Sequence, residues 1–266
     1  MRNPRIVFVG NERSAMAPCQ DITEEMTRLM AAAGEKKLHL RLIGGLAIKL
    51  HSPSAAHRAL QRAYPDIDLV VPKRDKRKLD GFFAEMGYLP EKNFNLLNGD
   101  RRQIFYDAQT GRRIDIFVGD FEMCHKLPMR GRLDAHPVTV PLAELFLSKT
   151  QIVELNRKDA LDIISLLLDN EVGYNDENQI NIDHITRLCI KDWGLYKTLT
   201  ITLSKVETIL VESNPGLDDE QRQRVLKRIN MIRRLLDRAN KPILWKMRDR
   251  VGTRLRWYTE VEEVNR

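Results

Sequence analysis

The sequence has little of what would place a protein in a membrane or stabilise it with disulfides. No apolar run approaches the roughly 18 residues of a membrane span, and the N-terminus lacks the uninterrupted apolar core of a signal peptide. The three cysteines, Cys19, Cys124 and Cys189, are scattered and lack the spacing of metal ligands. We therefore expect a cytoplasmic protein with reduced cysteines and no membrane association.

Internal repeats and low-complexity runs are also absent. A composition of 42% hydrophobic and 30% charged residues is typical of a soluble folded protein and argues against a disordered chain. The length of 266 residues suits one large domain or two modest ones. We predict two, with the boundary between Val140 and Tyr174.

Positive charge is concentrated at the C-terminal end. The whole chain has a net charge of +7, from 44 Lys and Arg against 37 Asp and Glu. The stretch from Gln221 to Arg266 contains 14 basic and 5 acidic residues, a local excess of +9. A basic region of this kind indicates a polyanionic partner, although a basic helix is often only a solvated surface.

A pair of carboxylates stands out in the short apolar run YPDIDLVVP. Asp66 and Asp68 are two residues apart, so on a strand both side chains point to the same face of the sheet. Two like charges at the end of a buried strand repel each other and resist desolvation. The pair therefore predicts a compensating cation, and a divalent metal is the obvious candidate.

A third carboxylate is expected on a later strand. The segments Gln103–Asp107 and Arg113–Val118 predict a β-hairpin, with a turn around Gly111. Asp115 lies inside the second strand between two isoleucines, where a carboxylate is unfavourable without a partner.

Two adjacent glycines precede the carboxylate pair. We predict a strand over Leu38–Ile43, a tight turn at Gly44 and Gly45, and a short helix from about Leu46. Glycines between a strand and a helix let the backbone approach a phosphate closely. Considered alone, however, such a pair more often only makes a turn.

Most of the remaining chain is predicted to be helical. Periodicity and capping residues predict helices over residues 21–35, 73–88, 141–155 and 156–170, and only helices beyond Val172. Two of these helices carry charged residues of interest, Lys149 and Asp159. Considered singly, Lys149 is a surface lysine and Asp159 a first-turn residue that favours the helix dipole.

The order of these motifs resembles that of the DNA polymerase beta superfamily of nucleotidyltransferases. More closely, four stretches look like the AbiEii/AbiGii toxin type of this superfamily: LIGGLAIKLHSPS, RAYPDIDLVV, RRIDIF and PLAELFLSKTQIVELNRKDALDIISLL. The similarity covers roughly Leu38 to Leu168. It implies an α+β fold in which a mixed sheet with flanking helices (residues 1–140) is followed by an all-helical domain (residues 141–266), whose helices over 141–170 complete the active site.

The resemblance also implies roles for individual residues. The turn that holds the nucleoside triphosphate would be made by Gly44 and Gly45, and both metal ions, Mg²⁺ or Mn²⁺, would be bound by Asp66 and Asp68. Asp115 would be the third carboxylate and metal ligand, on the metal that activates the attacking hydroxyl. The remaining matches are Lys149 as the lysine that contacts the phosphates, Asp159 as the acid of an Arg/Lys-Asp motif, and Arg62 as an arginine before the first acid. The chain departs from the superfamily pattern at Gly45, where Ser is common, and at Tyr64, where Thr is common.

This family implies transfer of a nucleoside monophosphate from a nucleoside triphosphate to a hydroxyl. The expected acceptor is RNA, tRNA in particular, with the chain acting as the toxin of a toxin–antitoxin or phage-defence pair and binding a cognate antitoxin. A small molecule or a protein is the alternative acceptor. A third possibility is a binding module that has the same fold and no activity.

Overall fold

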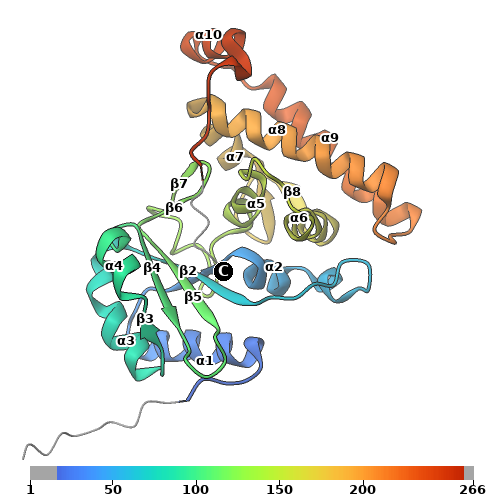
Figure 1. Ribbon diagram of the computed structural model, residues 1–266. Coiled ribbons are helices and arrows are strands. Elements are labelled where there is room, and N and C mark those ends of the chain that lie inside the picture. Colours follow the sequence, from blue (N-terminus) through green and yellow to red (C-terminus); the bar gives the residue numbers. More distant parts are fainter. Residues whose placement is uncertain (1–16, 261–266) are drawn as a thin grey trace, which may run out of the picture.

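The computed structural model describes residues 17–260, which form a mixed sheet with helices around and above it (Figure 1). The strands are β1 (Arg41–Ile43), β2 (Asp66–Val71), β3 (Leu89–Pro90), β4 (Arg102–Tyr106), β5 (Arg113–Val118), β6 (Asp120–Glu122), β7 (Lys126–Pro128), β8 (Glu171–Gly173) and β9 (Gln179–Asn181). The α-helices are α1 (Ile22–Glu35), α2 (Gly44–His51), α3 (Leu79–Glu85), α4 (Lys92–Asn98), α5 (Leu142–Thr150), α6 (Arg157–Asp169), α7 (Ile182–Lys191), α8 (Trp193–Thr208), α9 (Asp219–Arg238) and α10 (Ile243–Val251).

The central sheet has five strands in the order β1-β2-β5-β4-β3. β2 and β5 are parallel neighbours, whereas β1 with β2, β4 with β5, and β3 with β4 pair antiparallel. The predicted α+β class with a mixed sheet is thereby confirmed. The predicted hairpin is also confirmed, because β4 and β5 pair from Arg102 opposite Phe117 to Tyr106 opposite Arg113.

The connection from β1 to α2 is tighter than predicted. β1 has three residues, and α2 begins directly at Gly44 instead of near Leu46. Gly44 has a φ of +73°, which is accessible to glycine and unfavourable for other residues. The two glycines therefore make the first turn of the helix itself, and both are buried.

Several predicted helices differ at their ends. α5 ends at Thr150, before the end of the predicted helix, although the apolar periodicity continues. The carbonyls of Ile152 and Val153 accept hydrogen bonds from Thr202 Oγ1 (3.3 Å) and Lys205 Nζ (3.0 Å) of α8. The residues after α5 are thus held against α8 without helical structure, and Ile152, Val153 and Leu155 are partly buried there. The helix predicted over residues 73–88 begins as a 3-10 helix, and α3 forms only from Leu79.

The prediction that the chain beyond Val172 is wholly helical, and with it the all-helical C-terminal domain, was wrong. β8 and β9 form a small parallel sheet, with Val172 opposite Ile180. Strands of three residues are too short to produce a recognisable alternation of apolar and polar side chains. β9 is followed immediately by α7, which Asn181 caps by accepting the backbone N–H of His184 (3.1 Å).

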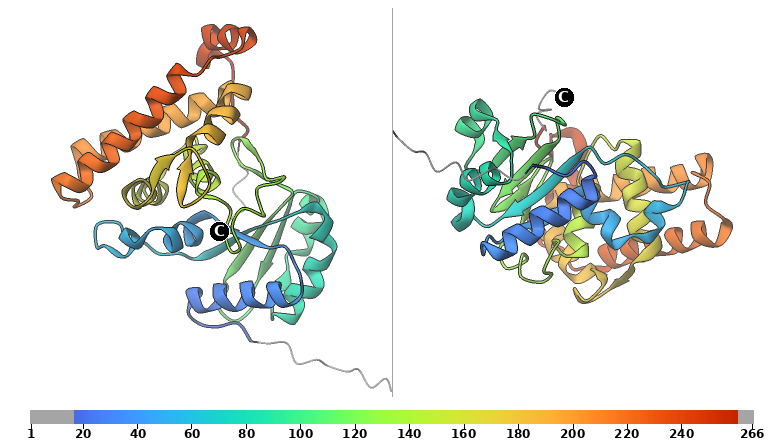
Figure 2. Two further views of the ribbon diagram at one scale, coloured as in Figure 1. Left: turned by 180° about the vertical axis from the view of Figure 1, so that it is seen from behind. Right: turned by 90° about the horizontal axis from the view of Figure 1, so that it is seen from below.

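The helices after β7 are stacked on one side of the sheet. α5 packs against β1, α2, α6 and α8, and α6 packs against α2 and α9. In Figures 1 and 2, α8 and α9 lie side by side on the outside of this stack, with α10 at the far end. One apolar core runs through the sheet and these helices, from Leu42 and Leu69 to Leu203 and Ile232. None of the helices in residues 17–260 is both long and apolar enough to cross a membrane.

Candidate functional site

The three predicted carboxylates lie on neighbouring parallel strands. Asp68 of β2 is directly opposite Asp115 of β5, and Asp66 is opposite Arg113. Because side chains alternate along a strand, Asp66 and Asp68 share one face, and the parallel register adds Asp115 to it. Long-range pairing thus brings together acids that are 47 positions apart in sequence (115 minus 68).

Two arginines of the hairpin neutralise Asp115. Arg102 of β4 donates from Nε to Asp115 Oδ1 (2.7 Å) and from Nη2 to Asp115 Oδ2. Burial opposes the charge on Arg102, but its hydrogen bond to Asp115 outweighs this effect and raises the pKa of the guanidinium. Arg113 Nη2 lies 3.7 Å from both Asp66 Oδ2 and Asp115 Oδ2. Two guanidinium groups thus offset the negative charge of Asp115, of whose surface only 1% is exposed.

Asp68 is the carboxylate without a compensating partner. Within the described residues no side chain or backbone group forms a hydrogen bond or ion pair with it, although it is only partly exposed. Burial, and then the negative charge of Asp115, raise the pKa of Asp68 to about 7, while Lys149 lowers it. A cation next to Asp68 would favour its charged form.

The glycine pair makes room for charged side chains of the site. A Cβ on Gly44 would overlap Oδ2 of Asp68 and lie 3.0 Å from its Cγ. A Cβ on Gly45 would overlap the Arg62 guanidinium and lie 3.2 Å from Cδ1 of Tyr64. At the start of α2, Gly44 therefore lies directly against Asp68, and Gly45 lies directly against Arg62.

A second charged cluster, which we call the α5–α6 charge cluster, consists of Arg62, Lys149, Asp159 and Asp162. Arg62 forms two parallel hydrogen bonds to Asp162, from Nε to Oδ1 (2.7 Å) and from Nη2 to Oδ2 (2.6 Å). Lys149 Nζ lies 2.7 Å from Asp159 Oδ1 and 3.1 Å from Asp162 Oδ2. Asp159 is held in turn by Asn156 Nδ2, which donates to its Oδ2 (2.8 Å).

The charge of Lys149 is strongly stabilised within this cluster. Burial lowers its pKa, but Asp162, Asp159 and, more weakly, Asp68 outweigh burial and raise the pKa of Lys149 to about 12. This cluster adjoins the carboxylates through the start of α2, because Gly44 lies against Asp68 and the next residue, Gly45, lies against Arg62. The ring of Tyr64 completes the border, with the Arg62 guanidinium stacked 4.0 Å from its centroid.

The eight residues expected at the site thus fall into two adjoining groups. One contains Gly44, Gly45, Asp66, Asp68 and Asp115, and the other contains Arg62, Lys149 and Asp159. The prediction missed Arg102, Arg113 and the function of Asp162 as the acid shared by Arg62 and Lys149. The antiparallel hairpin offered a signal for Arg102, because it brings this residue beside the strand of Asp115.

Two tryptophans near the C-terminus are held by hydrogen bonds to preceding helices. Trp245 is 8% exposed, and its Nε1 donates to the carbonyl of Cys189 (3.0 Å). Trp257 is partly buried and donates from Nε1 to Thr198 Oγ1 (3.0 Å). These rings attach the C-terminal segment to α7 and α8, so they are not freely available to stack on nucleic-acid bases.

Residue types at the site suit a hard divalent cation. Asp66, Asp68 and Asp115 provide only carboxylate oxygens, which Mg²⁺ and Mn²⁺ prefer. In the described residues the Asp68 carboxylate has no hydrogen-bond or ion-pair partner, and it lies against the Gly44 turn. Among residues 17–260 no three His, Cys, Asp or Glu side chains are gathered as a finished ligand set. The residues therefore fit a metal ion by chemistry and position, and Arg102 and Arg113 now provide part of the positive charge.

No model of a known protein family matches the chain, and no curated protein is significantly similar to it.

Proposed function

We propose that the chain is a metal-dependent nucleotidyltransferase that moves a nucleoside monophosphate from a nucleoside triphosphate to a hydroxyl of RNA. The observation that carries this proposal is the register of β2 and β5, which aligns Asp68 with Asp115 and adds Asp66 on the same face. The start of α2 and the cations Lys149 and Arg62 adjoin these carboxylates. Phosphoryl-group chemistry requires this combination of oxygen ligands, backbone donors and cations.

Under this proposal some residues of the site bind the metal and others bind the triphosphate. Asp66 and Asp68 would hold Mg²⁺, with Asp115 on the side of the acceptor hydroxyl, and the bound metal would supply charge stabilisation at the reacting phosphate. The backbone N–H groups at the start of α2 are available to the triphosphate, because the first N–H groups of a helix have no intrahelical partner. Lys149 and Arg62 add positive charge where pyrophosphate leaves.

Asp162 would keep this cationic border in place. It hydrogen-bonds Arg62 and lies 3.1 Å from Lys149, so both cations are oriented before a nucleotide binds. Since Asp162 has 2% of its surface exposed, water competes little for these contacts. The cations are therefore preorganised, which lowers the reorganisation needed during the reaction.

Nucleotidyl transfer is tested directly with labelled substrates. The purified chain is incubated with each α-labelled nucleoside triphosphate, Mg²⁺ and total tRNA, and label in RNA is measured. We expect incorporation with the native chain and at least about a hundredfold less with Asp66→Asn/Asp68→Asn, since metal ligands are lost. Asp80→Asn/Asp183→Asn is the matched control, because it changes the charge equally at exposed positions.

The same assay separates the competing functions. Label that appears in a protein or small-molecule acceptor but not in RNA would replace the proposed acceptor. A lack of transfer with all nucleotides and all acceptors would favour an inactive module of the same fold and contradict the proposal. The proposed role as a toxin predicts growth arrest on expression of the native chain, relieved by Asp66→Asn/Asp68→Asn and by a cognate antitoxin.

A further inference from the structure

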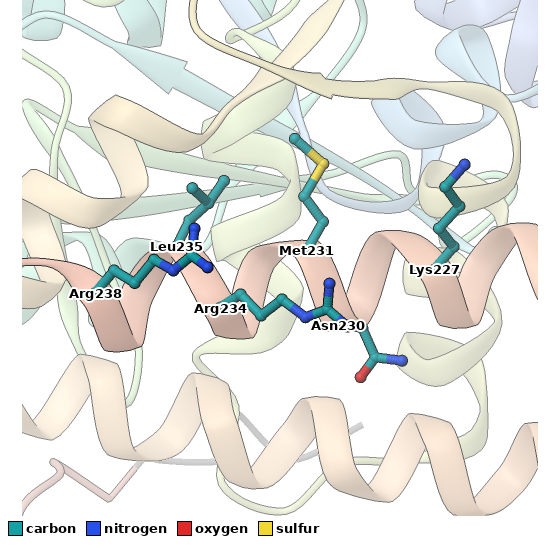
Figure 3. A pocket seen from close by; sticks show the side chains of 6 residues that line it. All are labelled: Lys227, Asn230, Met231, Arg234, Leu235 and Arg238. Carbon is teal, nitrogen blue, oxygen red and sulfur yellow. The ribbon is translucent and has the colours of Figure 1, made fainter.

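The outer face of α9 has a row of cations, which we call the α9 basic face. It consists of the exposed Lys227, Arg234 and Arg238, with exposed Asn230 between the first two (Figure 3). These residues recur at intervals of one or two helical turns and therefore lie on one side of the helix. With a rise of about 1.5 Å per residue, the cations span about 16 Å from Lys227 to Arg238.

These three cations have no acidic partner, in contrast to their neighbours on α9. Arg222, Arg224, Arg228 and Arg233 pair with Asp219, Glu220, Glu171 and Glu207, respectively. Within residues 17–260 no carboxylate lies at ion-pair distance from Lys227, Arg234 or Arg238. The basic residues of α9 thus fall into two sets: four arginines whose charge is paired with a carboxylate, and three cations whose charge is not.

The chemistry of the α9 basic face suits phosphate groups better than bases or lipids. Its apolar residues, Met231 and Leu235, are partly buried and project to one side of the helix (Figure 3). They therefore expose little apolar surface to a lipid, and the pocket along this face contains no aromatic ring for a base to stack on. A phosphate backbone needs only spaced cations and polar donors, which Lys227, Arg234, Arg238 and Asn230 provide.

The distance of this face from the carboxylates sets a lower limit on the size of the partner. α6 carries Asp159 and Asp162, and it packs between α2 and α9. Arg228 of α9 donates to the carbonyls of Leu167 (2.8 Å) and Leu168 (2.9 Å) of α6. The site and the α9 basic face are therefore separated by a helix of about 10 Å diameter. A mononucleotide is too small to reach both, whereas a folded polynucleotide is large enough.

We propose that the α9 basic face binds the phosphate backbone of the RNA acceptor while its reacting end lies at the carboxylates. The identification of this RNA as the acceptor rests on the proposed nucleotidyl transfer, whereas the docking itself does not. Because the contacts are with phosphates, binding depends on salt and little on RNA sequence. The surface thus selects a large structured acceptor over a small molecule.

The test measures binding of total tRNA without nucleotide or Mg²⁺, by fluorescence anisotropy over a series between about 50 and 200 mM salt. We expect Lys227→Ala/Arg234→Ala/Arg238→Ala to weaken binding about tenfold or more at the low end of this range, and to reduce the slope of log affinity against log salt by about 2 to 3. All three side chains are exposed and unpaired, so the variant should fold, which circular dichroism checks.

The matched control removes the same charge elsewhere. Arg77, Lys92 and Arg130 are also exposed, and in the described part of the chain no carboxylate pairs with them. Their combined change to alanine should alter affinity less than about threefold, as expected for long-range electrostatics alone. Equal losses in the two triple variants would overturn the proposal, because net charge and not the α9 basic face would then determine binding.

Further binding measurements identify the partner and distinguish RNA docking on the α9 basic face from the proposed catalytic activity. Unchanged tRNA affinity in the α9 variant, or binding to anionic vesicles in place of RNA, would overturn it. Binding to duplex DNA with the same loss in the variant would support backbone docking and assign it to polynucleotides in general. Asp66→Asn/Asp68→Asn should still bind tRNA, because it leaves the α9 basic face unchanged. Failed transfer by the native chain, together with α9-dependent tRNA binding, would contradict only the catalytic proposal.

Discussion

Two adjacent glycines allow the charged side chains of the site to lie against the first turn of α2. Gly44→Ala would place a methyl group on the Asp68 carboxylate and put alanine at a φ of +73°, which is unfavourable by about 1 to 2 kcal/mol. Gly45→Ala would displace the Arg62 guanidinium. We expect both variants to lower the free energy of unfolding by at least about 1 kcal/mol, measured by urea denaturation.

Gly34→Ala is the control for the glycine variants. Gly34 lies in the last turn of α1, and an added Cβ would meet no atom within 4 Å. Alanine should therefore leave stability unchanged or raise it by up to about 1 kcal/mol. If Gly44→Ala and Gly34→Ala have the same urea midpoint, the close approach of Asp68 to the α2 backbone is refuted.

Asp162 forms ion pairs with two cations in the α5–α6 charge cluster. Asp162→Asn removes the buried negative charge that Arg62 and Lys149 share, and the remaining positive charges repel each other. We expect a loss of about 3 kcal/mol in the free energy of unfolding, as is typical when one partner of a buried ion pair is removed. Urea denaturation at neutral pH measures this loss.

Asp219→Asn is the matched control for Asp162. Asp219 pairs with Arg222, but its side chain is 88% exposed, so its loss should change stability by less than about 0.5 kcal/mol. Similar small effects of Asp162→Asn and Asp219→Asn would mean that Asp162 does not stabilise the site.

The C-terminal end of α2 holds a partly buried histidine. His51 is the last residue of α2, and its Nε2 lies 2.8 Å from Thr139 Oγ1. Burial, and then the neighbouring His136, lower the pKa of His51 from 6.5 to about 4. The imidazole therefore stays neutral in the folded chain at pH values where it is protonated in the unfolded chain.

Stability should accordingly depend on pH through His51. Between pH 6.5 and about 4 the unfolded state binds the extra proton, so the free energy of unfolding falls as pH falls. The shift corresponds to a loss of about 3 kcal/mol over this range. We expect His51→Gln to flatten this part of the curve relative to the native chain, measured by urea denaturation at successive pH values.

His57→Gln is the control for the pH series. His57 is exposed in the loop after α2, so the variant should keep the pH dependence of the native chain. If the native chain and His51→Gln lose stability in parallel below pH 6.5, burial of a neutral His51 is disproved.

Across the whole molecule, one apolar core joins the sheet to the helices beyond it. α5 packs on β1 and α2, and Val140 N donates to the carbonyl of Leu42 (2.9 Å). The predicted boundary between Val140 and Tyr174 thus passes through α5 and α6, which are among the most buried elements of the chain. The division into two domains stays a prediction, and the continuous core argues that the two parts unfold together.

Cooperative unfolding can be measured because all three tryptophans, Trp193, Trp245 and Trp257, follow the predicted boundary. Tryptophan fluorescence therefore reports on the C-terminal part, whereas far-ultraviolet circular dichroism reports on every helix and strand. We expect both signals to give the same urea midpoint, since a shared core couples the two parts. Two separate transitions would show that residues before and after the boundary are independent folding units.

The sequence by itself determined the elements whose signals are local. The hairpin over β4 and β5 follows from alternation around a glycine turn, and Asp21 caps α1 by accepting the N–H groups of Thr23 and Glu24. The common face of Asp66 and Asp68 follows from their spacing on a strand. The resemblance to a known family then supplied the order of the remaining site residues.

Only the tertiary structure decided which groups meet. The opposition of Asp68 and Asp115 depends on the register of two strands, and the pairing of Arg62 with Asp162 depends on how α6 packs against α2. Burial, which made Trp245 a core residue and left Lys227, Arg234 and Arg238 exposed, is likewise a property of the packed chain. Sequence periodicity records local geometry, whereas charge pairing and burial arise from contacts between residues far apart in the chain.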